Sequence, residues 1–205
     1  MKPIKFPPNI FWLFFLCILV LFSGCTPQNQ GSGSTTTEQI QIIQSASYGE
    51  ISLEQMYQEA DFIFVGKIIQ ISSTQWNQDN GEYWNDETTT GETALQVHTI
   101  EVEPIQSIVD NLGQEGTVKI TILGSSPMDG SHADHDLKVG MQVMFFTQER
   151  EIAWRGGMKM IVGLMGAPSY SYFTLGEDGL YHGALLTQPI SLQEVMEQIS
   201  DLREP

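Results

Sequence analysis

The chain has only two cysteines, Cys17 and Cys25, and both belong to its first 25 residues. That segment begins with two lysines, continues through an almost unbroken apolar run at 10–22, and ends in small residues before Cys25. The apolar run is shorter than the roughly 20 residues that a helix needs to cross a bilayer. We therefore predict a secretory signal peptide over residues 1–24, with a single-pass membrane anchor as the alternative.

The residues around Cys25 resemble the lipobox of bacterial lipoproteins. The match is Leu21-Phe22-Ser23-Gly24-Cys25, and Phe22 departs from the family pattern, in which leucine is most common. The resemblance implies cleavage before Cys25 and a covalent diacylglycerol on its thiol. It also implies a lipid anchor on the outer face of a bacterial cytoplasmic membrane, or on the periplasmic side where an outer membrane is present. An ordinary signal peptide with a chance cysteine is the alternative.

The mature chain would have to fold without a disulfide, because Cys17 is removed and Cys25 is acylated. Residues 25–38 are rich in Gly, Ser, Thr, Gln and Asn, which predicts a flexible tether. A tether of about 15 residues has a root-mean-square reach of roughly 20 Å. Residues 39–205 then form a single domain of ordinary size, stabilised by its core alone.

The net charge of the mature chain excludes one class of partner. Two of the nine basic residues and none of the 25 acidic residues lie in the signal segment, so the remainder carries a formal charge of −18. Such a surface repels phosphate backbones and anionic lipid headgroups, so we expect no nucleic-acid partner. Membrane contact is expected through the acyl chains.

The hydrophobic pattern predicts a mainly β fold between two helices. Capping boxes at Ser52–Gln55 and Ser191–Glu194 mark the start of a short N-terminal helix, expected over 52–60, and of an amphipathic C-terminal helix. Alternating or β-branched apolar runs predict strands at 62–71, 95–108, 117–123, 141–147, 160–164, 170–175 and 180–182. This order of elements favours a small OB-like antiparallel barrel with the helices packed on it. The side chains expected inside the barrel are Phe64, Ile69, Ile120, Val143 and Phe145, and methionines including Met158 and Met160 are expected to fill the core.

Three segments resemble netrin-like domains, the fold of the tissue inhibitors of metalloproteinases. They are Glu59–Lys67 (EADFIFVGK), the strand from His98 to Ile108 with its following turn and strand, and Leu137–Phe146 (LKVGMQVMFF). The resemblance covers about half of the mature chain and implies a five-stranded OB-type barrel. The inhibitors of that family place a disulfide-locked N-terminal cysteine on a catalytic zinc. Cys25 has no partner cysteine and lies on a tether, so the inhibitory activity does not carry over.

The segment Ser131–Asp136 (SHADHD) is the densest group of possible metal ligands. Its imidazoles and carboxylates suit a borderline metal such as Zn²⁺, and the four candidate ligands are His132, Asp134, His135 and Asp136. A site there needs a further ligand from elsewhere, either His98 or His182. The Gly-flanked, polar composition favours a solvated loop, which would attract divalent cations only weakly. Asp79–Glu82 likewise lacks the full order of a calcium loop.

Two further observations concern function. Trp76, Tyr83 and Trp84 lie in a long polar loop and are candidates for an aromatic interaction surface, with half-buried packing as the alternative. The chain has no G-x-S-x-G, H-E-x-x-H, Walker A or C-x-x-C motif. The sequence thus favours a lipid-anchored, non-enzymatic module without a bound cofactor, which binds an unknown extracytoplasmic protein or small ligand. A metal-binding protein or enzyme that uses the loop at 132–136 is the alternative.

Overall fold

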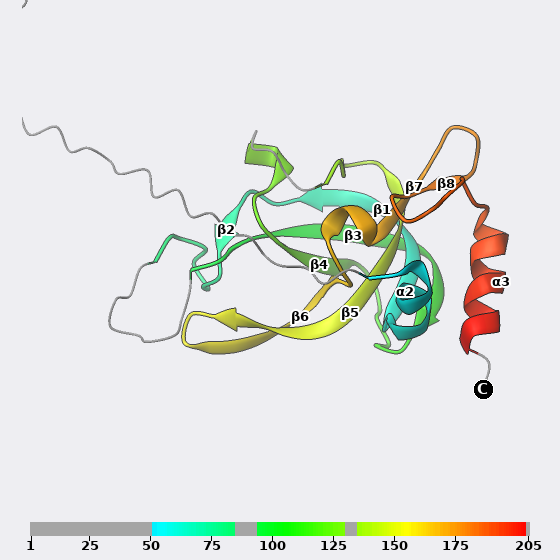
Figure 1. Ribbon diagram of the computed structural model, residues 1–205. Helices are drawn as coiled ribbons and strands as arrows, with labels where there is room; N and C mark the ends of the chain where they lie inside the picture. The colour runs from blue at the N-terminus through cyan, green and yellow to red at the C-terminus, as the bar shows by residue number, and fades with distance from the viewer. Residues whose placement is uncertain (1–50, 85–93, 130–134, 204–205) are drawn as a thin grey trace, which may run out of the picture. The chain divides into compact units, whose positions relative to one another are not determined.

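The computed structural model describes residues 51–84, 94–129 and 135–203. The predicted signal peptide, Cys25 and the predicted tether lie outside these ranges. In the described part, two α-helices enclose a run of eight strands in chain order (Figure 1). The elements are α2 (Leu53–Glu59), β1 (Phe62–Ile71), β2 (Gln75–Trp76), β3 (Gln96–Asp110), β4 (Val118–Leu123), η1 (Pro127–Asp129), β5 (Gln142–Trp154), β6 (Gly157–Leu164), η2 (Pro168–Tyr170), β7 (Tyr172–Leu175), β8 (Tyr181–His182) and α3 (Leu192–Arg203).

The strands form one mixed eight-stranded sheet that curls into a partial ring. Its strand order is β1-β3-β4-β6-β5-β7-β8, with β2 paired to β3, and β1 also pairs antiparallel with β5. The pairing between β4 and β6 is parallel and consists of the single bridge Thr121↔Gly163. Five strands therefore follow one another around the ring, and the β4–β6 side is its weakest junction.

The side chains of β1 point alternately to its two faces, so this strand contributes to two hydrophobic cores. Phe62 and Phe64 belong to a cluster that draws buried residues from all five ring strands, so this cluster is the ring interior. Ile63 and Val65 point to the opposite face and belong to a second cluster with α2, α3 and β7. Because both faces of β1 are buried, its sequence is an unbroken apolar run at this point.

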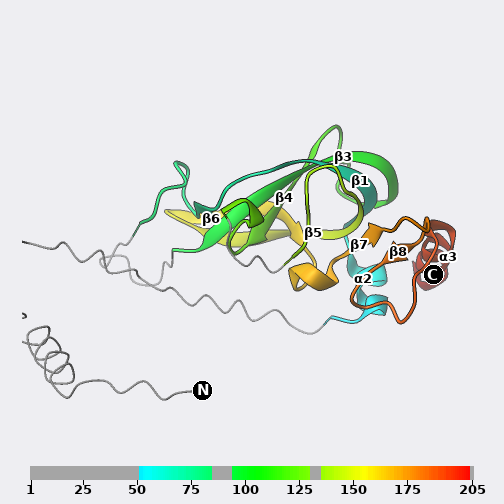
Figure 2. The same cartoon turned by 90° about the horizontal axis from the view of Figure 1, so that it is seen from above.

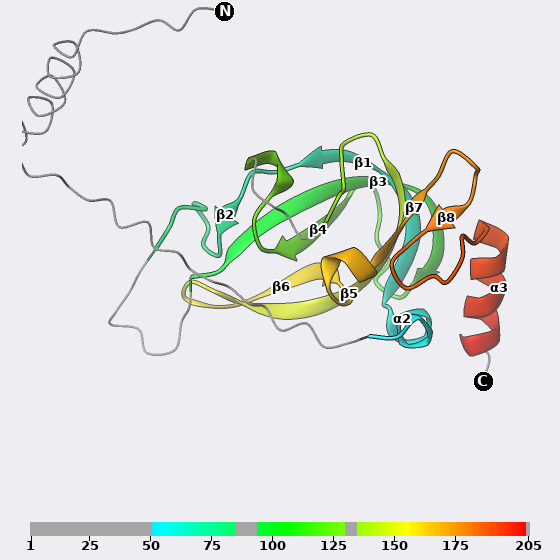
Figure 3. The same cartoon turned by 45° about the horizontal axis from the view of Figure 1, so that its top comes forward.

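Both predicted capping boxes are present at the helix starts. The Ser52 hydroxyl accepts a hydrogen bond from the Gln55 backbone N–H, and the Gln55 side chain accepts one from the Ser52 backbone N–H. Ser191 and Glu194 make the same reciprocal pair before α3. Figure 1 shows α3 at the end of the described domain away from β2 and the β5–β6 turn, and Figures 2 and 3 show the same separation.

The structure corrects several core assignments. Ile69 is 42% exposed rather than internal, because its neighbour Ile68 takes the inward-facing position of β1 and successive side chains of a strand point to opposite faces. Met158 and Met160 are more than half exposed, because they lie on the outer face of the β5–β6 hairpin. The other four expected core residues, Phe64, Ile120, Val143 and Phe145, are fully buried.

Candidate functional site

One candidate surface lies where the loop around β2 meets the turn of the β5–β6 hairpin. Trp76 and Tyr83 form an edge-to-face aromatic pair there, with ring centroids 4.8 Å apart. Tyr83 is 43% exposed and Trp76 is partly exposed. We call these two residues the aromatic pair. Their packing against each other fixes the position of two large side chains that still face solvent.

Asn77 attaches this loop to the sheet. Its side chain is fully buried, and its Oδ1 accepts hydrogen bonds from the Trp84 indole N–H at 3.0 Å and from the Leu95 backbone N–H at 2.7 Å. Its Nδ2 donates to the Ala153 carbonyl on β5 at 3.1 Å. One amide thus joins two parts of the loop to the hairpin, which holds the neighbouring Trp76 in place.

Basic and acidic side chains complete the joint between loop and hairpin. Arg155 donates through its backbone N–H to the Asn77 carbonyl and through its guanidinium to Gln78 Oε1, each at 2.8 Å. The same guanidinium lies 5.6 Å from the centre of the Trp84 ring. Trp154 Nε1 donates to Asp79 at 3.1 Å. Sequence reasoning missed Asn77 and Arg155, because only the folded chain brings the hairpin turn to the loop.

The three aromatic residues that the sequence singled out are therefore not equivalent. Trp84 is only 5% exposed, and its indole N–H is used by Asn77. It supports the loop from within, whereas Trp76 and Tyr83 face outward. The acidic residues beside them have local partners: Asp79 accepts from the Trp154 indole, and Glu82 bonds to Asn80 through its side chain and its backbone.

The second candidate site is a buried pair of histidines. His98 Nε2 lies 2.8 Å from His135 Nε2, and the two residues are 1% and 6% exposed. His98 continues the inward-facing row of β3 that includes Ile100 and Val102. His135 precedes Leu137, which is buried in the ring interior. The sequence named His135 as a candidate ligand and His98 or His182 as the residue that could approach it, and the structure brings His98 to His135. His132 and Asp134 lie outside the described residues.

Backbone contacts assign the tautomers of this pair. His98 Nδ1 lies 3.1 Å from the Gly124 carbonyl, which only accepts, so Nδ1 carries the proton. The Leu137 backbone N–H donates to His135 Nδ1 at 3.3 Å, so that nitrogen carries a lone pair. A neutral His135 then has its proton on Nε2 and donates it to the lone pair of His98 Nε2. Each of the four ring nitrogens thus has a hydrogen-bond partner of complementary character.

Burial disfavours the charged form of His98. Desolvation lowers the pKa of His98, and the hydrogen bond to Gly124 and the charge of Asp129 oppose this shift only in part. A metal bound between the rings would need a lone pair on His135 Nε2. The contact with the Leu137 N–H places the lone pair of that ring on Nδ1 instead. In the described ranges, no group of three or more His, Cys, Asp or Glu side chains is arranged to hold a metal ion.

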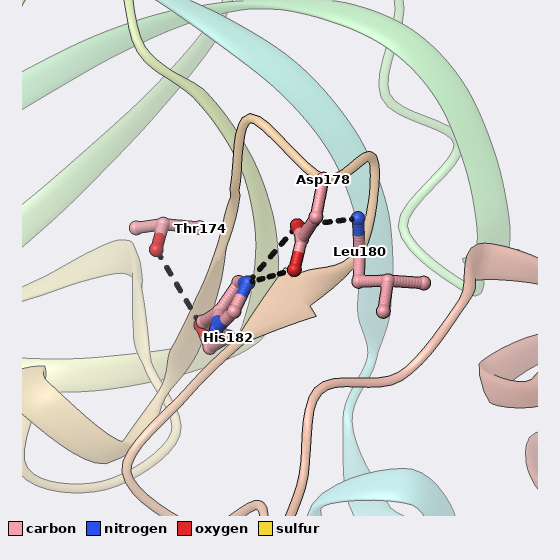
Figure 4. Close-up of polar contacts among 4 residues, drawn as sticks. All are labelled: Thr174, Asp178, Leu180 and His182. Carbon is pink, nitrogen blue, oxygen red and sulfur yellow. Dashed lines mark hydrogen bonds and ion pairs between the residues drawn. The ribbon is translucent and has the colours of Figure 1, made fainter.

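The hairpin of β7 and β8 brings a hydroxyl, an imidazole and a carboxylate together without aligning them for catalysis. His182 Nε2 lies 3.1 Å from Asp178 Oδ1 at an exposed position. The Thr174 hydroxyl, however, donates to the backbone carbonyl of His182 at 3.5 Å and not to its ring (Figure 4). The Thr174 hydroxyl is therefore bonded to the backbone of His182, and the imidazole is paired with Asp178.

A groove runs between α2 and α3. It has a volume of about 510 Å³ and is lined by Leu53, Glu54, Tyr57, Gln198, Asp201 and Leu202. The Tyr57 hydroxyl beside it is buried and has no hydrogen-bond partner in the described structure. Desolvation raises the pKa of Tyr57 to about 12, so the phenol is protonated at neutral pH.

Comparisons with known proteins assign no relative to this chain. No family model, no curated protein and no solved structure matches it. None of the helices among the described residues is long and apolar enough to span a bilayer.

Proposed function

We propose that the protein is a lipid-anchored extracytoplasmic lipoprotein whose β domain is a binding module without enzymatic activity. The observation that carries this proposal is the segment Leu21–Cys25 after a short apolar run, followed by a polar tether. A diacylglycerol on Cys25 would hold the domain within roughly 20 Å of the membrane surface.

We propose further that the partial ring is an OB-type barrel. Five strands, β1, β3, β4, β6 and β5, follow one another around it, and β1 pairs with β5. The OB fold is a five-stranded, partly open barrel. The connection between the first two ring strands carries Trp76 and Tyr83, and it meets the β5–β6 turn through Asn77 and Arg155. In OB-type barrels the corresponding loops contact ligands.

The aromatic pair is the surface that we propose for partner contact, and the partner we propose is a protein. Tyrosine and tryptophan are enriched among the residues that dominate protein–protein binding energy, because they bury much area with few rotatable bonds. Here the bonds of Asn77 already hold the loop in place, so binding would cost little further ordering of the backbone.

The anchor and the contact surface are tested in one cell-based experiment. The photo-crosslinking residue p-benzoylphenylalanine replaces Tyr83 in one variant and Tyr170 in another, since both tyrosines are 43% exposed. We expect a discrete protein adduct from position 83 and none from position 170. In the Cys25→Ser background, we expect loss of fatty-acid labelling and loss of the adduct.

The outcomes separate the two parts of the proposal. Equal fatty-acid labelling of the wild type and Cys25→Ser contradicts the anchor. Normal labelling with the same adducts, or with none, from both positions contradicts the aromatic pair as the contact surface.

A further inference from the structure

The groove between α2 and α3 continues into a second hollow. The first hollow has a volume of about 510 Å³, and the second, of about 220 Å³, lies against the connection between β8 and α3. Leu53 of α2 and Gln198 of α3 line both, so the two hollows are adjacent, and we call them together the helix groove. Figures 1 and 3 show α3 at the end of the domain away from β2, so the helix groove is a separate surface from the aromatic pair.

The floor of the helix groove is apolar. Leu53 and Leu202 line the first hollow, and Leu185 and Leu186 line the second. All four are only partly buried, and they pack against the cluster that α2 and α3 form with β1 and β7. Covering the apolar surface that these leucines leave in the groove is favourable, so an occupant with an apolar face is expected.

The walls of the helix groove are acidic. Glu54 lies on the α2 side, Glu194 and Asp201 lie on the α3 side, and all three are exposed. Hydrogen bonds from the Ser191 backbone N–H and hydroxyl hold the Glu194 carboxylate and lower its pKa, so it is charged at neutral pH. Among the described residues, no lysine or arginine lines either hollow.

The helices themselves offer little positive charge to balance these walls. Two acidic residues in α2 and three in α3 stand against one basic residue, Arg203. Its guanidinium donates to the carbonyls of Tyr57 and Ala60 at the end of α2. Charge complementarity therefore selects a basic occupant.

The spacing of the acidic residues on α3 suits a particular geometry. Glu194, Gln198 and Asp201 are four and three residues apart, so they lie on one face of the helix. Seven residues separate Glu194 from Asp201, which corresponds to about 10 Å along the axis. Basic side chains seven residues apart in a partner helix have the same separation. A helix packed nearly parallel to α3 can therefore bring one basic side chain to each carboxylate.

The construction of the walls favours a helix over an extended peptide. The N–H and C=O groups in the middle of α2 and α3 are bonded within those helices, so an extended peptide would find few backbone partners there. An amphipathic helix satisfies its own backbone and presents one apolar face to a groove. We propose that the helix groove binds an amphipathic helix of another protein, whose apolar face covers the four leucines and whose lysine or arginine side chains, seven residues apart, pair with Glu194 and Asp201.

A second copy of this chain does not fit that description. Its α2 and α3 would bring five further acidic residues to the three carboxylates of the groove, and its Arg203 is already bonded to α2. Like charges placed opposite each other disfavour such a pair. The partner is therefore a different, basic protein.

The test uses the full chain in micelles of a non-ionic detergent, with ¹³C-labelled leucine and methionine methyl groups. The probe is a spin-labelled synthetic peptide of about 18 residues, long enough to form a helix. It has a leucine face flanked by lysines seven residues apart. We expect paramagnetic broadening of the Leu53 and Leu202 methyl signals and none at Met158, an exposed methionine on the β5–β6 hairpin. A peptide of the same composition without an apolar face, and one with glutamates in place of the lysines, should leave Leu53 and Leu202 unchanged.

Matched variants separate the groove from the charge of the whole chain. Glu54→Gln/Asp201→Asn and Glu149→Gln/Glu151→Gln each remove two exposed carboxylates, the first pair in the groove and the second on β5. We expect the apparent Kd to rise by about threefold to thirtyfold in the groove variant and by less than about twofold in the other. Micelles take up the same share of peptide in every sample, so the ratio between variants is the measured quantity.

Gln198→Arg tests the groove without removing an acidic residue. Gln198 is exposed in the middle of α3, and arginine is a good helix former, so the helix should persist. The new guanidinium lies one turn from both Glu194 and Asp201 and competes with the lysines of the peptide. We expect this variant to lose the broadening at Leu53 and Leu202, while the methyl signals of the ring interior keep their wild-type positions.

Four results would overturn the proposal. The first is broadening in the wild type that is absent or equal at Leu53, Leu202 and Met158. The second is the same rise in Kd in both double variants. The third is equal broadening by either control peptide. The fourth is a shift of the Leu53 and Leu202 signals with protein concentration alone that Gln198→Arg abolishes, since a second copy would then occupy the groove.

Discussion

Arg203, the last residue of α3, donates a hydrogen bond from its Nε to the backbone carbonyl of Tyr57 at 2.6 Å. Its Nη2 also donates to the Ala60 carbonyl at 2.7 Å. Both carbonyls lie at the C-terminal end of α2, where the last turn of a helix leaves acceptors without partners. The Arg203 side chain therefore joins the two helices, because it donates to carbonyls at the end of α2 that lack partners within that helix. Tyr57 and Arg203 are 146 residues apart in the sequence.

Replacing Arg203 should loosen this junction. We expect Arg203→Ala to lower the free energy of unfolding by about 1–3 kcal/mol, because two charge-assisted hydrogen bonds to partly buried carbonyls are lost. Arg203→Lys should recover only part of the loss, since an ammonium cannot reproduce the fork of the guanidinium. Chemical denaturation measures both, and Lys138→Ala, at an exposed lysine, serves as the control. A loss no larger than that of the control would contradict the role of Arg203.

Gly66 on β1 is a close-packing point. A Cβ built there overlaps Val102 Cγ1 and lies 3.0 Å from the Glu103 carbonyl oxygen, and the β1–β3 register shifts beside it. We expect Gly66→Ala to destabilise the domain by about 1–3 kcal/mol through overpacking. In a Val102→Ala background the same substitution should cost less, because the overlapping methyl is gone. Equal costs in both backgrounds, measured by denaturation, would show that Val102 is not the obstacle.

The helices and most strands could be predicted because their signals are local. Capping boxes and apolar runs need no knowledge of distant residues, and both helix starts follow them. The end of β5 was placed at Thr147, but the strand continues to Trp154. The apolar pattern stops at the polar residues Gln148–Glu151, although a hairpin that extends beyond the ring exposes such side chains to solvent.

The sequence indicated which residues the candidate sites contain, but not how these residues lie in the folded chain. His98 and His135 are separated by 37 residues, and their contact depends on which face of β3 is internal and on the path of the β4–β5 connection. Tyr83 and Trp84 are adjacent in sequence, yet Trp84 is buried with its indole N–H bonded to Asn77, whereas Tyr83 is exposed. No periodicity distinguishes them, because the loop has no regular alternation.

The unpartnered hydroxyl of Tyr57 predicts a stabilising substitution. A buried hydroxyl without a hydrogen bond costs free energy, so Tyr57→Phe should leave stability unchanged or raise it by up to about 1 kcal/mol. Tyr181→Phe is the contrast, because that hydroxyl bonds to Gln142 and its loss should be destabilising. A clear loss of stability in Tyr57→Phe would reveal a partner for the hydroxyl.

The raised pKa of Tyr57 adds a pH dependence to this comparison. The unfolded phenol loses its proton near the ordinary pKa of 10.0, whereas the folded one keeps it to about 12. The unfolded state therefore binds fewer protons between these values, and wild-type stability should fall as the pH rises from 10 to 12. Denaturation curves across this range should show a smaller fall in Tyr57→Phe, and an identical fall would assign the effect to other groups.

Asp178 should titrate below its ordinary pKa of 3.8. The largest cause is the hydrogen bond from the Leu180 backbone N–H to Asp178 Oδ1, and the second is the His182 ring (Figure 4). A side-chain ¹³C titration between pH 2 and pH 6 measures the carboxyl directly. In His182→Ala the pKa of Asp178 should rise but stay below 3.8, because the Leu180 bond remains. A full return to 3.8 would make the imidazole the dominant cause.

The last prediction joins the stability of the aromatic pair to its proposed role. Asn77→Ala removes the partners of two N–H groups and of the Ala153 carbonyl, all at partly or fully buried positions, and should cost about 2–4 kcal/mol. Asn80→Ala, at an exposed neighbour that bonds to Glu82 in the described structure, should change stability by less than about 1 kcal/mol. Because Asn77 fixes the loop that carries Trp76 and Tyr83, its loss should also weaken the adduct from position 83, while labelling of Cys25 persists. Denaturation and crosslinking measured on the same two variants separate these effects. An unchanged adduct in a destabilised Asn77→Ala protein would mean that partner contact does not depend on the fixed loop.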